Sequence, residues 1–138
     1  MAEVELAFDP YGIPEIAALD PEGLAFGLGY AHARDRLFQL EFQRLAAAGR
    51  LTELLGPPAL EADRFLRRLG FVRRARTDWE AQSADAARLL RAYDAGVNAR
   101  LGEGGPAAVP EFRLLNHEPA PWHPIDCLAV GRLIGWTL

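Results

Sequence analysis

The chain has 138 residues, of which 50% are hydrophobic, and its formal net charge is −4 at neutral pH. This length suits one modest domain with a core of its own. The acidic balance gives no basic surface of the kind that binds nucleic acid, and no uncharged apolar run is long enough to cross a membrane. Because Cys127 is the only cysteine, an internal disulfide bond is excluded.

Residues 1–19 have the pattern of a β or extended segment. Val4, Leu6 and Phe8 alternate with more polar residues, which predicts a short strand. Asp9 to Gly12 has the composition of a turn, and a second extended stretch follows it. A hairpin this short is marginal alone, so we expect it to pack on helices or to pair with strands elsewhere.

Residues 20–56 are predicted to be the central helix, around which the rest of the chain is arranged. Asp20 is a suitable N-cap, Pro21 suits the first helical position, and Gly49 is a plausible C-cap or kink. Gly27 and Gly29 each weaken a helix by about 1 kcal/mol relative to alanine. We therefore expect another element to approach closely there. One apolar face is predicted from residues spaced by three and four: Leu24, Leu28, Ala31, Phe38, Phe42 and Leu45.

Asp35 lies on this predicted apolar face, at a position where a leucine would be expected. A buried carboxylate without a partner would cost several kcal/mol, so we expect an arginine or a backbone N–H beside it. Arg64 is the best candidate, although the sequence does not assign the contact. The pair Asp35 and Arg64 is therefore predicted to be a structural buried charge. An orienting residue near a site, or a direct catalytic carboxylate, are the alternative roles for Asp35.

Residues 57–101 are predicted to be helical and residues 102–124 to form a loop. A helix is expected over Leu60 to Gly70, and the spacing of Thr77 and Glu80 resembles a capping box that begins the next amphipathic helix. The proline-rich run from Glu118 is predicted to be helix-free.

Pro124 is predicted to begin a last helix that is cut short, over residues 124–138. Its end, LIGWTL, would expose apolar side chains in a finished domain. We therefore expect a single helical domain, 1–138, that is a fragment or a subunit whose partner surface lies elsewhere.

Catalytic and metal-binding patterns are missing from the sequence. His32, His117, His123 and Cys127 show no ligand spacing, so no metal site is predicted. No nucleophile-elbow motif is present, and the only serine, Ser83, is expected on a solvated helix. We therefore predict no catalytic residue in this chain.

An ordered series of motifs resembles one known family, that of the penicillin acylases (penicillin amidases). The motifs run over nearly the whole chain: Asp9 with Tyr11 to Ile16, Gly29 to Gly56, Ala62 to Phe65, Ala92 and Tyr93 with Gly96 to Ala99, Pro110 to Phe112, and Trp122, Pro124 and Asp126. They resemble the N-terminal part of the family's small (alpha) subunit. Two residues depart from the pattern, because the family usually has a basic residue at the position of Phe8 and often a histidine at that of Glu15.

The resemblance implies a mostly α chain with a short N-terminal β element, belonging to a parent enzyme with the αββα fold of N-terminal nucleophile hydrolases. In this family a precursor is cut so that a serine, or in some relatives threonine or cysteine, begins the large (beta) subunit. Its hydroxyl attacks an acyl amide while its own α-amino group accepts the proton. The substrate would be a β-lactam side chain, an acyl-homoserine lactone or another N-acyl compound, and this chain alone would be inactive.

The resemblance also places Ile134, Thr137 and Leu138 at or near positions that line the acyl pocket of the family. From the residues alone, Ile134 and Leu138 are equally ordinary core residues. Calcium is expected only in the complete enzyme, with its small-subunit ligand beyond Leu138. The family is usually exported, which implies a periplasmic or extracellular parent, although this sequence carries no signal peptide. The alternative is a non-catalytic helical module that binds or forms a homo-oligomer through exposed core faces.

Overall fold

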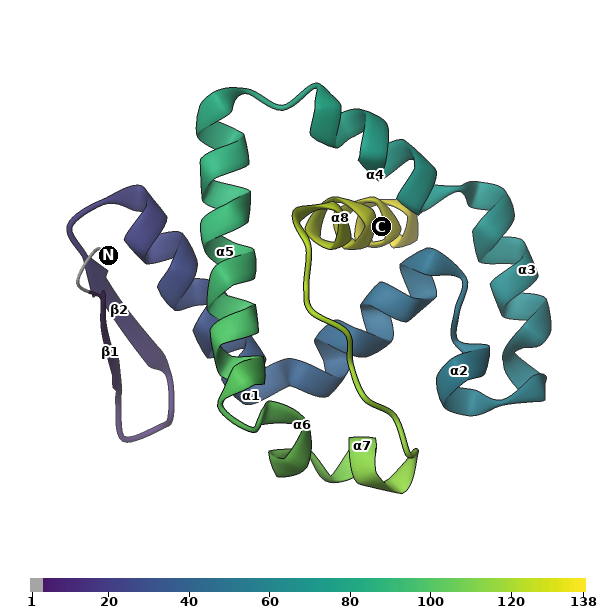
Figure 1. The fold of residues 1–138 in the computed structure, drawn as a ribbon, viewed down its shortest axis with the longest axis horizontal. Helices are drawn as coiled ribbons and strands as arrows, with labels where there is room; N and C mark the ends of the chain where they lie inside the picture. Colours follow the sequence, from purple (N-terminus) through teal and green to yellow (C-terminus); the bar gives the residue numbers. More distant parts are fainter. Residues whose placement is uncertain (1–3) are drawn as a thin grey trace.

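The computed structural model describes residues 4–138, apart from the side chains of residues 105 and 106, and is mostly helical with one short sheet (Figure 1). Residues 1–3 of the predicted β segment lie outside the described residues. The elements are β1 (Val4–Phe8), β2 (Pro14–Ala18), α1 (Pro21–Ala48), α2 (Thr52–Leu55), η1 (Pro57–Ala59), α3 (Leu60–Leu69), α4 (Phe71–Glu80), α5 (Ala84–Gly102), α6 (Gly105–Ala108), α7 (Pro110–Leu114) and α8 (Pro124–Thr137). This confirms the predicted fold class of the chain.

The two strands form the predicted hairpin. They pair antiparallel with Leu6 opposite Ile16, and both contact α1. The turn is closed by the Asp9 carboxylate, which accepts hydrogen bonds from the backbone N–H groups of Tyr11 at 2.9 Å and Ile13 at 2.8 Å. The hairpin therefore packs on a helix, as an isolated hairpin of this length requires.

Helix α1 is held at both ends by the predicted caps and is kinked between them. The Asp20 side chain accepts a hydrogen bond from Gly23 N at 2.7 Å, and Gly49 ends the helix in the left-handed conformation with φ 63°. Arg36 has non-helical angles, φ −138° and ψ 28°. The kink divides α1 into a first half, residues 21–35, and a second half, residues 37–48.

The first half of α1 crosses α5 with the two backbones in direct contact. A methyl group added at Gly29 would overlap the carbonyl of Tyr93 on α5, and one added at Gly96 would overlap the carbonyl of Phe26 on α1. At Gly27 an added methyl group would lie 2.5 Å from Ile16 of the hairpin. The predicted close approach at Gly27 and Gly29 is confirmed, and we call the crossing of α1 and α5 at Gly29 and Gly96 the glycine crossing.

Helix α3 follows Gly56 and η1, and helix α4 follows Gly70. One predicted helix boundary in this region is wrong. Thr77 and Glu80 lie at the end of α4 and do not begin a helix. Helix α5 is capped instead by Ser83, whose hydroxyl accepts a hydrogen bond from Ala86 N at 3.2 Å. The hydroxyl of the only serine therefore has a structural role.

The predicted loop 102–124 contains two short helices, α6 and α7, before a helix-free stretch at residues 115–123. Helix α8 begins at Pro124, as predicted, with the His123 side chain and Asp126 forming its capping box. Viewed as in Figure 1, α8 is seen nearly end-on, and α1, α4 and α5 contact it from different sides.

The core lies where α1, α4, α5, α7 and α8 meet. Its buried members are Ala33, Leu37, Ala47, Ala75, Val97, Phe112, Trp122, Ala129 and Val130. A second cluster joins the end of α1 to α2, α3 and α4 through Leu45, Ala46, Leu51, Leu54, Ala59, Leu66 and Phe71. None of the helices in residues 4–138 combines the length and the apolar character needed to cross a membrane.

Candidate functional site

The three predicted pocket residues lie on the last turns of α8. Ile134 is 44% exposed, Leu138 is fully exposed, and the Thr137 hydroxyl donates a hydrogen bond to the Ile134 carbonyl at 2.8 Å. Trp136, beside them, is also exposed. We call Ile134, Trp136, Thr137 and Leu138 the outer end of α8. Ile134 and Leu138 are therefore not core residues among the described part of the chain.

Apolar surface continues from the outer end of α8 to neighbouring helices. The ring of Trp136 lies 5.7 Å from that of Phe65 on α3 and 6.3 Å from that of Phe71 on α4. Phe65 is itself exposed. An exposed patch with several large apolar side chains is typical of a surface that contacts a ligand or another polypeptide.

A groove of 410 Å³ runs between α1, α5 and α8, and Ile134 lines it. We call it the α8 groove. Its lining is almost entirely apolar: Ala25, Leu28, Leu40, Leu89, Leu90, Tyr93, Trp122, Cys127, Val130, Gly131 and Ile134. Thr137 and Leu138 are not among these residues, so the structure brings only Ile134 of the three predicted residues to this cavity.

The prediction that Asp35 and Arg64 form a buried ion pair is wrong for the described chain. The Asp35 side chain is 41% exposed and lies 3.9 Å from its neighbour Arg34. The Arg64 side chain is 58% exposed and is paired with Glu61 at 2.6 Å. The predicted apolar face is wrong for much of the first half of α1, since Leu24 and Leu28 on that face are also exposed, at 45% and 43%.

The buried charges are instead Glu41 and Arg44, on the second half of α1. They are 2% and 8% exposed, and Arg44 Nη2 lies 2.6 Å from one Glu41 oxygen. The other Glu41 oxygen lies 2.7 Å from His117 Nε2, on the helix-free stretch after α7. The sequence carried a signal for this pair, since Glu41 and Arg44 are three residues apart among the apolar residues Leu40, Phe42 and Leu45.

Arg44 joins this pair to the start of α8. Its Nη1 donates a hydrogen bond to the Pro121 carbonyl at 3.2 Å and lies 3.7 Å from an oxygen of Asp126. Its guanidinium is also 5.7 Å from the centre of the Trp122 ring. Burial raises the pKa of the Asp126 carboxyl, although the His123 N–H and Arg44 act in the other direction. We call Glu41, Arg44, His117 and Asp126 the charge network.

Asn98 of α5 holds the same stretch from the other side. Its side chain accepts a hydrogen bond from Trp122 N at 2.7 Å and donates one to the Trp122 carbonyl at 2.8 Å. Two hydrogen bonds from one amide fix both the position and the direction of the backbone. Together with the charge network, they set where α8 begins.

Asp63 is a third buried charge that the sequence analysis missed. It accepts hydrogen bonds from Leu51 N at 2.7 Å, from Thr52 N at 2.8 Å and from the Thr52 hydroxyl at 2.5 Å. Burial opposes the charged form, but these hydrogen bonds outweigh it and hold the pKa of Asp63 below its ordinary value. The signal was its spacing with Leu66, three residues later, which places both on the buried face of α3.

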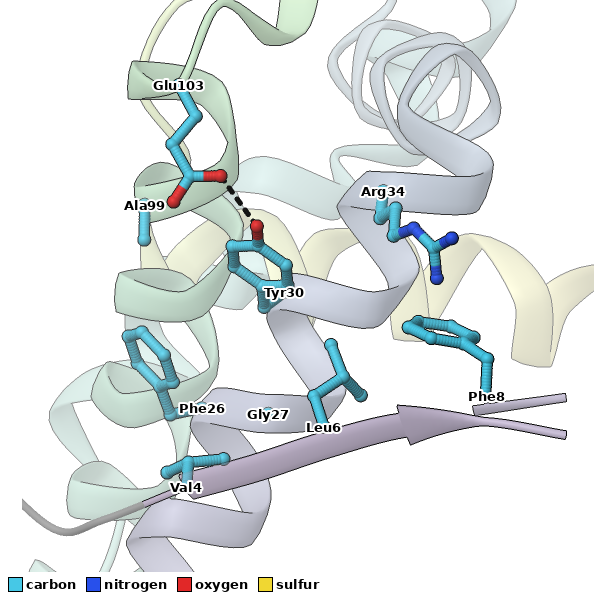
Figure 2. Close-up of a pocket in the computed structure, with 9 residues that line it drawn as sticks. All are labelled: Val4, Leu6, Phe8, Phe26, Gly27, Tyr30, Arg34, Ala99 and Glu103. Atoms are coloured by element: carbon cyan, nitrogen blue, oxygen red, sulfur yellow. Dashed lines mark hydrogen bonds between the residues drawn. The ribbon is translucent and has the colours of Figure 1, made fainter. Parts of the chain in front are cut away.

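A second cavity, of 520 Å³, lies between the hairpin, α1 and α5 (Figure 2). We call it the hairpin pocket. The Tyr30 hydroxyl donates a hydrogen bond to Glu103 at 2.6 Å, and the Arg34 guanidinium lies 3.5 Å from the centre of the Phe8 ring. The lining residues are Val4, Leu6, Phe8, Phe26, Gly27, Tyr30, Arg34, Ala99 and Glu103.

The histidines and the cysteine have structural contacts. His32 Nδ1 lies 2.9 Å from the Tyr93 hydroxyl, while His117 and His123 take part in the charge network and the α8 cap. Burial raises the pKa of the Cys127 thiol to about 11, although a hydrogen bond from Trp122 Nε1 at 3.1 Å opposes this. A thiol with a raised pKa is a poor nucleophile at neutral pH, which agrees with a core role for Cys127.

Within residues 4–138, no group of three or more His, Cys, Asp or Glu side chains could hold a metal ion. The described residues therefore do not fit a calcium site by themselves, and we assign no step to such an ion.

Comparison with known proteins identifies a class of acylases. The chain is 47% identical over 134 residues to the penicillin acylase 2 proenzyme of Pseudomonas sp. (strain SE83), and 34% identical over 135 residues to the acyl-homoserine lactone acylase QuiP of Pseudomonas aeruginosa. Its structure is similar to that of a thermostable penicillin G acylase from Alcaligenes faecalis, with a TM-score of 0.85 and 30% identity. That match covers 94% of this chain and 70% of the solved chain.

The penicillin amidase family model matches residues 3–138. The chain therefore belongs to the penicillin amidase family, which confirms the resemblance found in the sequence. The two sequence matches cover 97% and 98% of this chain but only 17% and 16% of the relatives. It thus spans about a sixth of the length of the curated relatives it matches.

Proposed function

We propose that this chain is the N-terminal part of the small subunit of an amidohydrolase that cleaves acyl amide bonds. The observation that carries the proposal is the match along the whole chain to a penicillin acylase proenzyme of which the chain spans 17%. The substrate is an N-acyl compound, such as a β-lactam with an acyl side chain or an acyl-homoserine lactone. Relatives named for each of these activities support this range.

The chemical step in this proposal belongs to a large subunit outside these 138 residues. Its first residue, a serine or in some relatives threonine or cysteine, attacks the amide carbonyl, and the free α-amino group accepts the proton. An α-amino pKa of about 8 suits this role at neutral pH. Oxyanion donors on the same subunit stabilise the tetrahedral intermediate. The chain alone is therefore expected to be inactive.

The contribution of this chain to the site is part of the acyl pocket. Ile134, Thr137 and Leu138 would contact the acyl group from the outer end of α8. Two features support this: these residues are exposed although two of them are apolar, and the start of α8 is fixed by the charge network and by Asn98. A wall that is rigidly placed can select among acyl groups by their size and shape.

The parent enzyme of this proposal has the αββα fold and is periplasmic or extracellular. Calcium, where the complete enzyme contains it, would be held by residues that include ones outside this chain.

The direct test is hydrolysis of a chromogenic phenylacetyl amide and of an acyl-homoserine lactone. The chain is assayed alone and together with the polypeptide encoded downstream of it. We expect turnover only with the downstream polypeptide, and we expect Ile134→Ala to change the ratio of kcat/KM between short and long acyl groups severalfold. Leu114→Ala, an exposed leucine on α7, is the matched control and should leave this ratio unchanged. Turnover by the chain alone would refute the assignment of the nucleophile.

The alternative is a non-catalytic module that associates with copies of itself. It is favoured by one observation, the exposed apolar surface formed by the outer end of α8 and Phe65. Sedimentation velocity distinguishes the two ideas. Self-association predicts a sedimentation coefficient that rises with concentration and that falls back in Ile134→Ser. A monomer at every concentration would exclude the alternative.

A further inference from the structure

The hairpin pocket is distinct from the outer end of α8 and takes no part in the function proposed above. Its volume of 520 Å³ lies within the range of about 300–1,000 Å³ that is usual for sites of small molecules. Figure 2 shows β1 along one side of the pocket, with α1 and α5 forming the others. The pocket combines apolar and charged groups, so a ligand that fits it would carry groups of both kinds.

The floor of the pocket is apolar. Val4 and Leu6 of β1 and Phe26 of α1 line it, while Gly27 allows the hairpin to approach α1 closely. A ligand that covers these side chains gains about 25 cal/mol for each Å² of apolar surface removed from water. The floor therefore selects a ligand with an apolar body.

The polar groups of the pocket carry one charge of each sign. Figure 2 shows the Tyr30 ring between Glu103 and Arg34, so the two charges lie on opposite sides of the phenol. The guanidinium carbon of Arg34 lies 3.5 Å from the centre of the Phe8 ring, and a guanidinium carries five N–H donors that can meet a carboxylate. Glu103 accepts a hydrogen bond from Tyr30, and a carboxylate can accept further hydrogen bonds.

The separation of the two charges sets the length of the ligand. Tyr30 and Arg34 are four residues apart on α1, which places their Cβ atoms about 5–6 Å apart, and Glu103 lies beyond the Tyr30 hydroxyl on the other side. The ammonium and carboxylate of a free amino acid share one carbon atom and are closer together than this. Two residues in an extended conformation span about 7 Å, which is enough to reach from one side of a phenol ring to the other.

We propose that the hairpin pocket binds an apolar dipeptide with free termini. Its ammonium group meets Glu103, its carboxylate meets the N–H groups of Arg34, and its side chains cover Val4, Leu6 and Phe26. Such a ligand carries both charges and an apolar body. A simple fatty acid would offer a carboxylate to Arg34 but no cation to Glu103.

The test is isothermal titration calorimetry of the 138-residue chain with L-leucyl-L-leucine, its N-acetyl form, its C-terminal amide and free L-leucine. We expect the dipeptide to bind and each of the other three to bind at least tenfold more weakly. Absence of dipeptide binding at millimolar concentration, or equal binding of the N-acetyl form or of leucine, would overturn the proposal. These comparisons use only the wild-type chain, so they hold whether or not a variant folds.

Two variants then test which residue of the pocket binds each terminus of the dipeptide. Arg34→Met keeps a side chain on Phe8 and should remove the preference for the free acid over the amide. Glu103→Gln keeps an acceptor for Tyr30 and should remove the preference for the free amine over the N-acetyl form. The control Arg91→Met alters an exposed arginine that lies 5.4 Å from the Trp79 ring, outside the pocket, and should change affinity less than twofold. An equal loss in this control would refute the assignment to Arg34.

Discussion

The two halves of α1 hold their neighbours in different ways. The first half meets α5 at the glycine crossing, where backbone touches backbone and no side chain intervenes. The second half meets the helix-free stretch and α8 through the charge network, where buried side chains bridge wider gaps. The difference teaches that one helix can fix one partner by shape alone and another by charge. These two contacts should fail for different reasons.

The largest expected effect is at the glycine crossing. Gly29→Ala should lower the free energy of unfolding by more than about 4 kcal/mol, because the new methyl group would overlap a backbone carbonyl that cannot rotate away. Urea unfolding followed by circular dichroism measures the loss.

Gly131→Ala is the matched control for this prediction. Gly131 also lies inside a helix, but nothing lies within 4 Å of an added methyl group. Better helix propensity should then raise the free energy of unfolding by about 1 kcal/mol. Equal losses in the two variants would mean that the crossing is not tight.

The second largest loss of stability is expected when the charge network is broken. Arg44→Met should lower the free energy of unfolding by about 3–5 kcal/mol, because the Glu41 carboxylate stays buried without its arginine.

Arg64→Met is a close comparison, since Arg64 also pairs with a glutamate three residues earlier at 2.6 Å, but on an exposed surface. Its loss should be below about 1 kcal/mol. Similar losses in both variants would show that burial adds nothing to the network.

The smallest expected effect is a dependence of the free energy of unfolding on pH. Of the two contacts, only the charge network should show it, because the backbone atoms of the glycine crossing do not titrate. Burial raises the pKa of Asp126 above its ordinary 3.8 in the folded state. This group therefore adds stability below pH 3.8 and loses it as pH rises through the folded pKa. Relative to wild type, Asp126→Asn should gain stability between pH 3.8 and neutrality.

Asp63 should show the opposite sign. Burial opposes its charged form, but hydrogen bonds outweigh burial and depress its pKa, so its stabilisation is present above 3.8 and is lost as pH falls through the folded pKa. Asp63→Asn should therefore be most harmful near neutral pH and least harmful in acid. Thermal unfolding at several pH values checks both variants, and the same sign in the two would contradict the assignment.

Local signals predicted much of the fold. The caps at Asp20 and Gly49 and the start of α8 at Pro124 depend on a few adjacent residues, and each was confirmed. The close approach at Gly29 was also predicted, because a glycine destabilises a helix interior and its presence there indicates a compensating contact. The sequence did not predict that Gly96 lies at the same crossing, because this depends on how two helices far apart in the chain meet.

The kink at Arg36 marks the limit of the sequence analysis. No proline or glycine lies within four residues of it, so none of the usual sequence causes of a kink is present. The spacing of large apolar residues also selected a face on which Leu24 and Leu28 are exposed, and with it Asp35, so that the buried Glu41 and Arg44 were missed. The predicted roles of Ile134, Thr137 and Leu138 depend on polypeptide outside this chain, and they remain predictions.

The glycine crossing also restricts how the molecule can move. Each of the two glycines accommodates the backbone of the opposite helix, so a slide of one helix along the other by a single residue would drive a side chain into a main-chain carbonyl. The motions that remain for α1 relative to α5 are hinging and complete separation. The layer made by α1 and α5 should therefore act as a stiff plate, and adaptation to a bound molecule would have to occur in the segments attached to it.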